Sequence, residues 1–112
     1  MKCGIHNPLN KKYSDKLLLS GKKPNQLHNN CAGKHLGMIS ACLTNFMDVK
    51  KYLESNHPYQ IKIKSVLEFF TETKISNNQI GTDGCSAPQY AFPLENLAVS
   101  MINLIKQYKE KN

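Results

Sequence analysis

Cysteine, lysine and histidine side chains gather in residues 27–38 of this 112-residue chain. Cys31 stands just before a glycine and the start of a helical pattern. Exposed backbone N–H groups and the helix dipole would stabilise a thiolate there, and Lys34 adds positive charge close by. Cys31 is therefore a candidate nucleophile or metal ligand, although a lone cysteine is more often a small buried hydrophobic residue.

A second candidate thiol, Cys85, follows the turn signal Asp83-Gly84. The chain has four cysteines and no C-x-x-C pattern, and nothing in it indicates secretion. In a reducing compartment such cysteines are thiols or metal ligands rather than disulfide partners. We therefore expect a cytoplasmic protein.

Ordered blocks of sequence surround these two cysteines. They read N-N-C-A-G-K-H-L-G at 29–37, H-P-Y-Q at 57–60, D-G-C-S-A-P at 83–88 and P-L-E-N-L-A at 93–98, preceded by C-G-I-H-N-P at 3–8. Their order and spacing, over essentially the whole chain, resemble the asparaginase II family, the rhizobial-type bacterial L-asparaginases. The resemblance implies hydrolysis of L-asparagine to L-aspartate and ammonia, and it leaves the preference for asparagine over glutamine open.

The same resemblance implies a zinc ion held by Cys31, Lys34 and Cys85, with water as the fourth ligand. Two thiolates would neutralise Zn²⁺, and coordination needs the lysine as a neutral amine. Residues three apart share a helix face, so Cys31 and Lys34 can converge on one ion. Asp83 and His35 are then implied to lie beside the ligands and to orient them.

The chain also departs from the family pattern. Ala32 replaces the usual serine, and Ser86 replaces the usual glycine after Cys85. The family nucleophile is a serine in a Ser-x-x-Lys pair that lies upstream of the segment matched at residues 3–8. The patterns at 20–23 and 71–74 lie elsewhere and are expected by chance in a lysine-rich chain. We predict no catalytic residue in this chain and no activity on its own, because an acyl-enzyme needs an activated nucleophile.

The elements that would position these residues are mostly helical. Apolar spacing and turn signals predict helices at 9–19, 34–47, 58–73 and 94–108, a loop at 26–33, and a short strand at 79–82. We expect a single unit over 1–112, a mainly α-helical fragment of an α/β serine-glutaminase or β-lactamase-like fold with at most two short strands. In residues 34–47 the predicted core stripe is Leu36, Ile39, Leu43 and Phe46.

The expected partners follow from the same reasoning. A piece of a larger domain would leave an apolar face such as that of residues 94–108 without its partner, so we expect either a complementary fragment or a homodimer. No apolar run approaches the ~20 residues of a membrane span. Net charge is +7, but every cation is lysine and the lysines are dispersed, which disfavours nucleic-acid binding. The alternatives are a non-catalytic zinc-binding or thiol-sensing helical module and a gene remnant.

Overall fold

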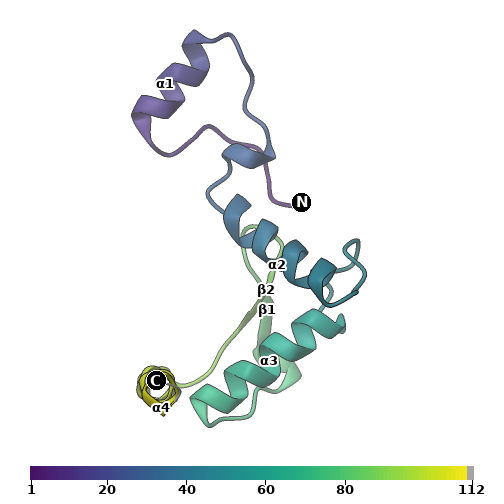
Figure 1. Cartoon of the computed structure of the whole chain (residues 1–112), viewed down its shortest axis with the longest axis vertical. Coiled ribbons are helices and arrows are strands. Elements are labelled where there is room, and N and C mark those ends of the chain that lie inside the picture. The colour runs from purple at the N-terminus through teal and green to yellow at the C-terminus, as the bar shows by residue number, and fades with distance from the viewer. Residues whose placement is uncertain (111–112) are drawn as a thin grey trace. The chain divides into compact units, whose positions relative to one another are not determined.

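The computed structural model describes residues 1–110, and this part of the chain contains four α-helices and one two-stranded sheet (Figure 1). The elements follow in the order α1 (Lys11–Leu19), η1 (Gln26–His28), α2 (Ala32–Thr44), α3 (Pro58–Thr71), η2 (Asn77–Gln79), β1 (Ile80–Thr82), β2 (Pro88–Tyr90) and α4 (Leu94–Glu110), where η marks a 3₁₀ turn. The prediction of a mainly helical chain with at most two short strands is confirmed.

The chain's contacts divide it into two compact units. The first consists of Met1–Tyr52 together with Gly84–Ser86, and the second of Leu53–Asp83 together with the chain from Ala87 onward. Each unit is described by itself below. The expectation of one unit over the whole chain stays a prediction.

In the first unit, local capping sets the helix ends. The Asn10 side chain accepts a hydrogen bond from the Tyr13 N–H (3.3 Å), so α1 begins at Lys11 rather than at residue 9. Helix α2 ends at Thr44, before the predicted residue 47. There the N–H of Met47 donates to the Cys42 carbonyl (2.8 Å) and that of Phe46 to Leu43 (3.2 Å). These two bonds form a Schellman motif.

The buried face of α2 differs from the predicted one. Its buried residues are Ala32, His35, Met38 and Cys42, whereas Leu36 and Leu43 are 45% and 62% exposed. The predicted stripe is therefore wrong. Apolar residues surround much of this helix, so their spacing fits two faces, and packing selected the face on which His35 bonds to Tyr52.

The second unit begins with α3, whose start was predicted from Pro58. His57 is the N-cap and its ring nitrogen Nδ1 accepts from the Tyr59 N–H (3.2 Å). Proline at the first helical position needs no N–H partner. The helix ends at Thr71, because Glu72 adopts a left-handed conformation (φ 52°).

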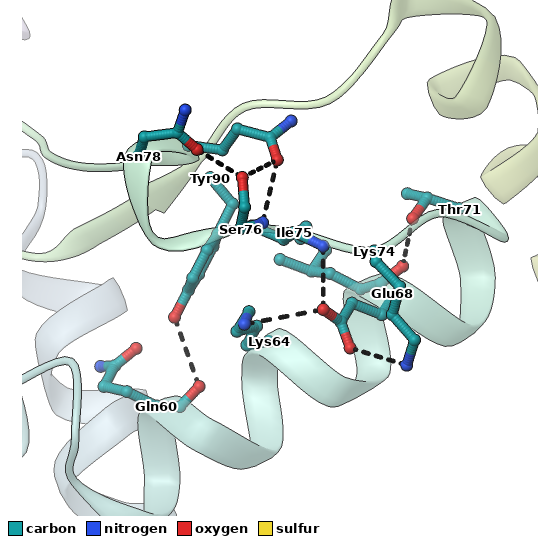
Figure 2. A network of polar contacts seen from close by, with 11 residues as sticks. Gln60, Lys64, Glu68, Thr71, Lys74, Ile75, Ser76, Asn78 and Tyr90 are labelled. Atoms are coloured by element: carbon teal, nitrogen blue, oxygen red, sulfur yellow. Dashed lines mark hydrogen bonds and ion pairs between the residues drawn. The ribbon is translucent and has the colours of Figure 1, made fainter.

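A short hairpin follows. Strands β1 and β2 are antiparallel, with Ile80 opposite Tyr90 and Thr82 opposite Pro88. The predicted strand at 79–82 is confirmed as β1, while β2 was missed, since proline is a weak strand signal that is tolerated at a strand's first position. The Tyr90 hydroxyl donates to the Gln60 carbonyl (3.3 Å), which ties β2 to α3 (Figure 2).

Helix α4 contacts the end of α3 through asparagine side chains. Asn96 Nδ2 donates to the Thr71 carbonyl (2.8 Å), and Asn103 Nδ2 donates to the Phe70 carbonyl (3.0 Å) and to Glu72 Oε1 (2.9 Å). These amides satisfy carbonyls that the last turn of α3 leaves without helical partners. No helix in residues 1–110 is long and apolar enough to cross a membrane.

Past the end of α3, the chain turns around the Glu68 carboxylate (Figure 2). Glu68 accepts the Ile75 N–H (2.9 Å) and forms ion pairs with Lys74 (3.4 Å) and Lys64 (3.7 Å). The Ile75 N–H, followed by the two lysines, lowers the pKa of Glu68 against the opposing effect of burial. The charged carboxylate therefore holds the segment that leads to the hairpin.

Candidate functional site

Three of the predicted site residues lie at the start of α2. Cys31 is the N-cap and is half-buried, Lys34 lies exposed in the first turn, and His35 is fully buried. The Cys31 side chain forms no capping hydrogen bond to the helix. The thiol therefore stands at the positive end of the helix dipole, the setting expected from the sequence.

Asparagine side chains position this helix start. The Cys31 N–H donates to Asn29 Oδ1 (2.7 Å), and Asn29 Nδ2 donates to the Gly4 carbonyl (2.8 Å). Asn30 Oδ1 lies 3.0 Å from Nε2 of His6. The Asn29-Asn30 pair thus connects the N-terminal segment to the backbone that carries Cys31.

Cys85 lies in the turn between β1 and β2 and is buried. Asp83 closes this turn, because its N–H donates to the Ala87 carbonyl (2.8 Å) and its Oδ1 accepts the Ala87 N–H (2.9 Å). Ser86 has φ +71°, a conformation that favours glycine. The usual family glycine at this position suits that backbone, so the serine here adds strain beside Cys85.

The first unit contains Gly84–Ser86 as well as Met1–Tyr52. Cys31, Lys34 and Cys85 therefore belong to one compact unit, although more than fifty residues separate the two cysteines. Asp83, the predicted neighbour of the ligands, is assigned to the second unit. None of the four cysteines, all within the described residues, forms a disulfide.

Tyr52 is a buried member of this unit that sequence reasoning missed. Its hydroxyl oxygen lies 2.6 Å from His35 Nδ1 and accepts the Lys2 N–H (3.2 Å), and its ring meets the imidazole edge-to-face. Burial raises the pKa of Tyr52; the Lys2 N–H opposes this shift, and negative charge on Cys3, Cys85 and Cys42 adds to it. The sequence carries no local signal for this pairing, since it joins residues seventeen positions apart across a loop.

The donor set of two cysteines and a lysine fits the zinc that the family resemblance implies. Thiolate sulfur and amine nitrogen are donors that Zn²⁺ accepts in tetrahedral sites. Within residues 1–110, no three or more His, Cys, Asp or Glu side chains gather closely enough to hold a metal. The set of Cys31, Lys34 and Cys85 contains only two residues of these four types, and it stays a prediction.

The hydroxyls that begin the two hydroxyl–lysine patterns donate to carbonyls of their own helices. Ser20 Oγ donates to the Leu17 carbonyl (2.7 Å), and Thr71 Oγ1 donates to the Leu67 carbonyl (2.7 Å). Lys74 pairs with Glu68 (Figure 2). Each hydroxyl proton is thus directed to a backbone carbonyl. That neither pattern is a catalytic pair stays a prediction.

A cavity of about 600 Å³ lies in the second unit. Its polar lining includes Ser55, Asn56, Lys64, Asn77 and Thr82, and it contains no cysteine or histidine. The predicted metal ligands Cys31, Lys34 and Cys85 are therefore not among the residues that line this cavity.

The cysteine, lysine and asparagines at the start of α2, together with Cys85 of the hairpin turn, belong to the motifs that resemble the asparaginase II family. A sequence model of the L-asparaginase II family matches residues 1–112. The chain belongs to this family. None of the curated proteins with which the chain was compared matches it.

Proposed function

We propose that this chain works in the hydrolysis of L-asparagine to L-aspartate and ammonia, as the portion of an L-asparagine amidohydrolase that holds a metal ion. The observation that carries the proposal is the family match over residues 1–112. It is supported by the placement of Cys31, Lys34 and Cys85 in one compact unit.

In this proposal Cys31, Lys34 and Cys85 would hold zinc. When bound, the ion would supply positive charge for binding and positioning the polar groups of the substrate. Cys31 contributes as a thiolate at a helix N-terminus, whose backbone is fixed by Asn29. Lys34 contributes as a neutral amine, so metal binding displaces a proton from its side chain.

His35 and Asp83 are proposed to hold these ligands in place. The Tyr52 hydroxyl bonds to His35 Nδ1 and so fixes the orientation of the imidazole beside Lys34. Asp83 closes the turn that carries Cys85. Both residues would act by restricting the ligands, which lowers the entropy lost when the metal binds.

The hydroxyl nucleophile is proposed to come from a Ser-x-x-Lys portion outside residues 1–112. Ser20 and Thr71, which begin the two similar patterns here, donate their hydroxyl protons to helix carbonyls. We therefore expect the chain alone to release no ammonia from asparagine. A complementary polypeptide that carries the serine pair would be its catalytic partner.

The metal part of the proposal is tested by measuring bound zinc per chain after reduction, reloading and dialysis. We expect about one equivalent in the wild type and its loss in Cys31→Ser, Lys34→Met and Cys85→Ser. Cys42→Ala is the matched control, because Cys42 is a buried thiol of the same helix outside the proposed set. Wild-type protein without zinc, or equal loss in Cys42→Ala, would contradict the assignment.

The reaction is tested separately by following ammonia release from L-asparagine. The chain alone is expected to be inactive with or without zinc, and activity is expected on mixing with the serine-bearing polypeptide. Turnover by the chain alone would show that a nucleophile is present within residues 1–112. Zinc binding without activity in the mixture would favour the non-catalytic zinc module over the amidohydrolase.

A further inference from the structure

The cavity of about 600 Å³ in the second unit has the size of a small-molecule site, since such sites span roughly 300–1,000 Å³. Its walls come from the segment before α3, from α3 itself, from η2 and from both strands of the hairpin. All of its lining residues belong to this one unit. The cavity is therefore a property of the second unit by itself.

Five polar side chains that line the cavity form no hydrogen bond within residues 1–110. They are Ser55, Asn56, Lys64, Asn77 and Thr82. The other asparagines that the structure describes in this unit are bonded, Asn78 to Ser76 and both Asn96 and Asn103 to the end of α3. The donors and acceptors around the cavity are thus available to a ligand, which would replace the water that solvates them.

Lys64 is the only charged residue of the lining, and its side chain is 30% exposed. Its Nζ atom lies 3.7 Å from Glu68 Oε1, which is longer than a hydrogen bond (Figure 2). The same oxygen accepts the Ile75 N–H at 2.9 Å. Lys64 is therefore a cation beside a carboxylate that is already bonded elsewhere, and its N–H groups can donate to a ligand.

The charges around Lys64 indicate the charge of the ligand. Glu68 is shared with Lys74 (3.4 Å), so Lys64, Lys74 and Glu68 together carry one net positive charge. No carboxylate lines the cavity. Proteins hold a phosphate dianion best with arginine forks or several converging backbone N–H groups, and this chain has no arginine. A single carboxylate is therefore the anion that fits.

The apolar part of the lining indicates the body of the ligand. It consists of Leu53, Ile61, Ile80 and Pro88. Ile61 and Lys64 are three residues apart and share one face of α3, so an apolar group can lie on Ile61 while a carboxylate reaches Lys64. The amide and hydroxyl groups of the lining suit a neutral polar group, such as an amide.

A free amino acid does not fit this lining. Its ammonium group would find no carboxylate there and would lie near the ammonium of Lys64, which repels it. L-Asparagine, the substrate in the proposed function, is therefore not the ligand expected here. The proposed metal ligands are also absent from the lining.

We propose that this cavity binds a small organic monocarboxylate that has an apolar body and a neutral hydrogen-bonding group, with Lys64 as its carboxylate-binding residue. Both a free N-acylated amino acid and the C-terminal end of a peptide have this chemistry. The proposal goes beyond the proposed function and does not depend on asparagine hydrolysis or on zinc.

The first test is an NMR titration of the wild-type chain with N-acetyl-L-leucine, which has a carboxylate, an amide and a branched apolar group. We expect saturable binding with a Kd on the order of 1 mM or tighter. The amide signals of Lys64, Asn77 and Thr82 should shift, and those of Cys31 and Cys85 should not. Absence of saturable binding, or shifts confined to the first unit, would overturn the proposal.

Three related probes separate the parts of the ligand. N-acetyl-L-leucinamide lacks the charge, L-leucine adds an ammonium group and N-acetylglycine lacks the apolar group, so each should bind about tenfold more weakly or worse. Equal binding of N-acetyl-L-leucinamide would overturn the assignment of a carboxylate. An acetylated tetrapeptide ending in leucine distinguishes the two sources: equal or tighter binding assigns the cavity to a peptide C-terminus, and weaker binding assigns it to a free acid.

The decisive variants change the charges at the cavity in opposite directions. Lys64→Met removes the cation and should weaken binding of N-acetyl-L-leucine by about tenfold or more. Lys62→Met is the matched control, because Lys62 is exposed on the same helix and does not line the cavity. Equal affinities of the two variants would overturn the role of Lys64.

Glu68→Gln should instead tighten binding of N-acetyl-L-leucine by about threefold, since it removes the carboxylate that competes for Lys64. The glutamine retains an oxygen that can accept the Ile75 N–H, so the turn after α3 is kept. Weaker binding in Glu68→Gln would overturn the assignment of an anion to this cavity. Zinc content and ammonia release, measured on the same proteins, test the proposed function separately.

Discussion

The Nδ1 atom of His35 lies 2.6 Å from the Tyr52 hydroxyl oxygen, and both side chains are almost completely buried. The Lys2 N–H donates to the same oxygen at 3.2 Å, so the Tyr52 O–H can donate to Nδ1. A neutral imidazole then carries its proton on Nε2. Tyr52 thus sets the orientation and the tautomer of the residue next to the proposed ligand Lys34.

Tyr52→Phe removes this hydroxyl and leaves the ring in place. We expect it to lower the free energy of unfolding by about 1–3 kcal/mol, because a buried ring nitrogen and the Lys2 N–H lose their partner. Urea unfolding measures the change. Tyr13→Phe, at an exposed position, should change stability by less than about 0.5 kcal/mol. Equal effects of the two variants would show that the His35–Tyr52 bond contributes nothing.

Ser86→Gly is expected to stabilise the turn that carries Cys85. Ser86 has φ +71°, which glycine adopts without steric cost. The strain relieved in the folded state is expected to exceed the entropy gained by the unfolded chain, so the free energy of unfolding should rise by about 0.5 kcal/mol. Thermal unfolding measures the gain. Ser65→Gly is the matched control within exposed α3 backbone, where the same substitution should instead destabilise by about 0.5–1 kcal/mol. Destabilisation by both would contradict the argument.

Phe46→Gly is expected to stabilise the end of α2. Phe46 is 99% exposed and occupies the left-handed position of the Schellman motif (φ 55°), where glycine is preferred. The expected gain is about 1 kcal/mol in urea unfolding, since almost no packing is lost. Phe46→Ala keeps the Cβ atom and should bring no gain; equal gains would assign the effect to the exposed ring.

His6 is expected to make stability depend on pH near neutrality. The Asn7 carbonyl (2.6 Å from Nδ1) raises the pKa of His6 most, followed by the Asn30 side chain. Because its pKa is raised, the contribution of His6 to the free energy of unfolding is fully present below the pKa of the unfolded chain, about 6.5. This contribution is lost as pH rises through the pKa of His6 in the folded protein. NMR titration of His6 should give a pKa above 6.5, and His6→Ala should remove this part of the pH dependence. A titration below 6.5 would contradict it.

Glu68 is expected to make the protein less stable in acid, which is the opposite pH dependence to that of His6. The Ile75 N–H, then Lys74 and Lys64, lower the pKa of this carboxylate. The contribution of Glu68 to stability is therefore present above the pKa of the unfolded chain, about 4.5, and is lost as pH falls through its lower pKa in the folded protein. Unfolding at a series of acidic pH values should show a loss that Glu68→Gln abolishes. An unchanged acid profile in that variant would place the dependence on other carboxylates.

The helices of this chain were largely predictable from sequence because their ends depend on neighbouring residues. Pro58 at the first helical position marks the start of α3, and the apolar spacing that begins at Leu94 marks α4. The predicted ends erred by a few residues where a backbone conformation decides, as at Glu72, since a left-handed residue other than glycine gives no signal in the sequence.

The order of motifs around Cys31 and Cys85 was enough to indicate the family, because the spacing of such residues is a property of the chain itself. Tertiary structure decided which side of each helix is buried and which stays exposed. Packing buried His35 and Cys42 of α2 in place of the predicted Leu36 and Leu43, and the asparagine bonds to α3 left the apolar side of α4 exposed. Periodicity shows that a helix has an apolar side, but burial is a property of the surfaces that meet, and residues distant in sequence supply the other surface.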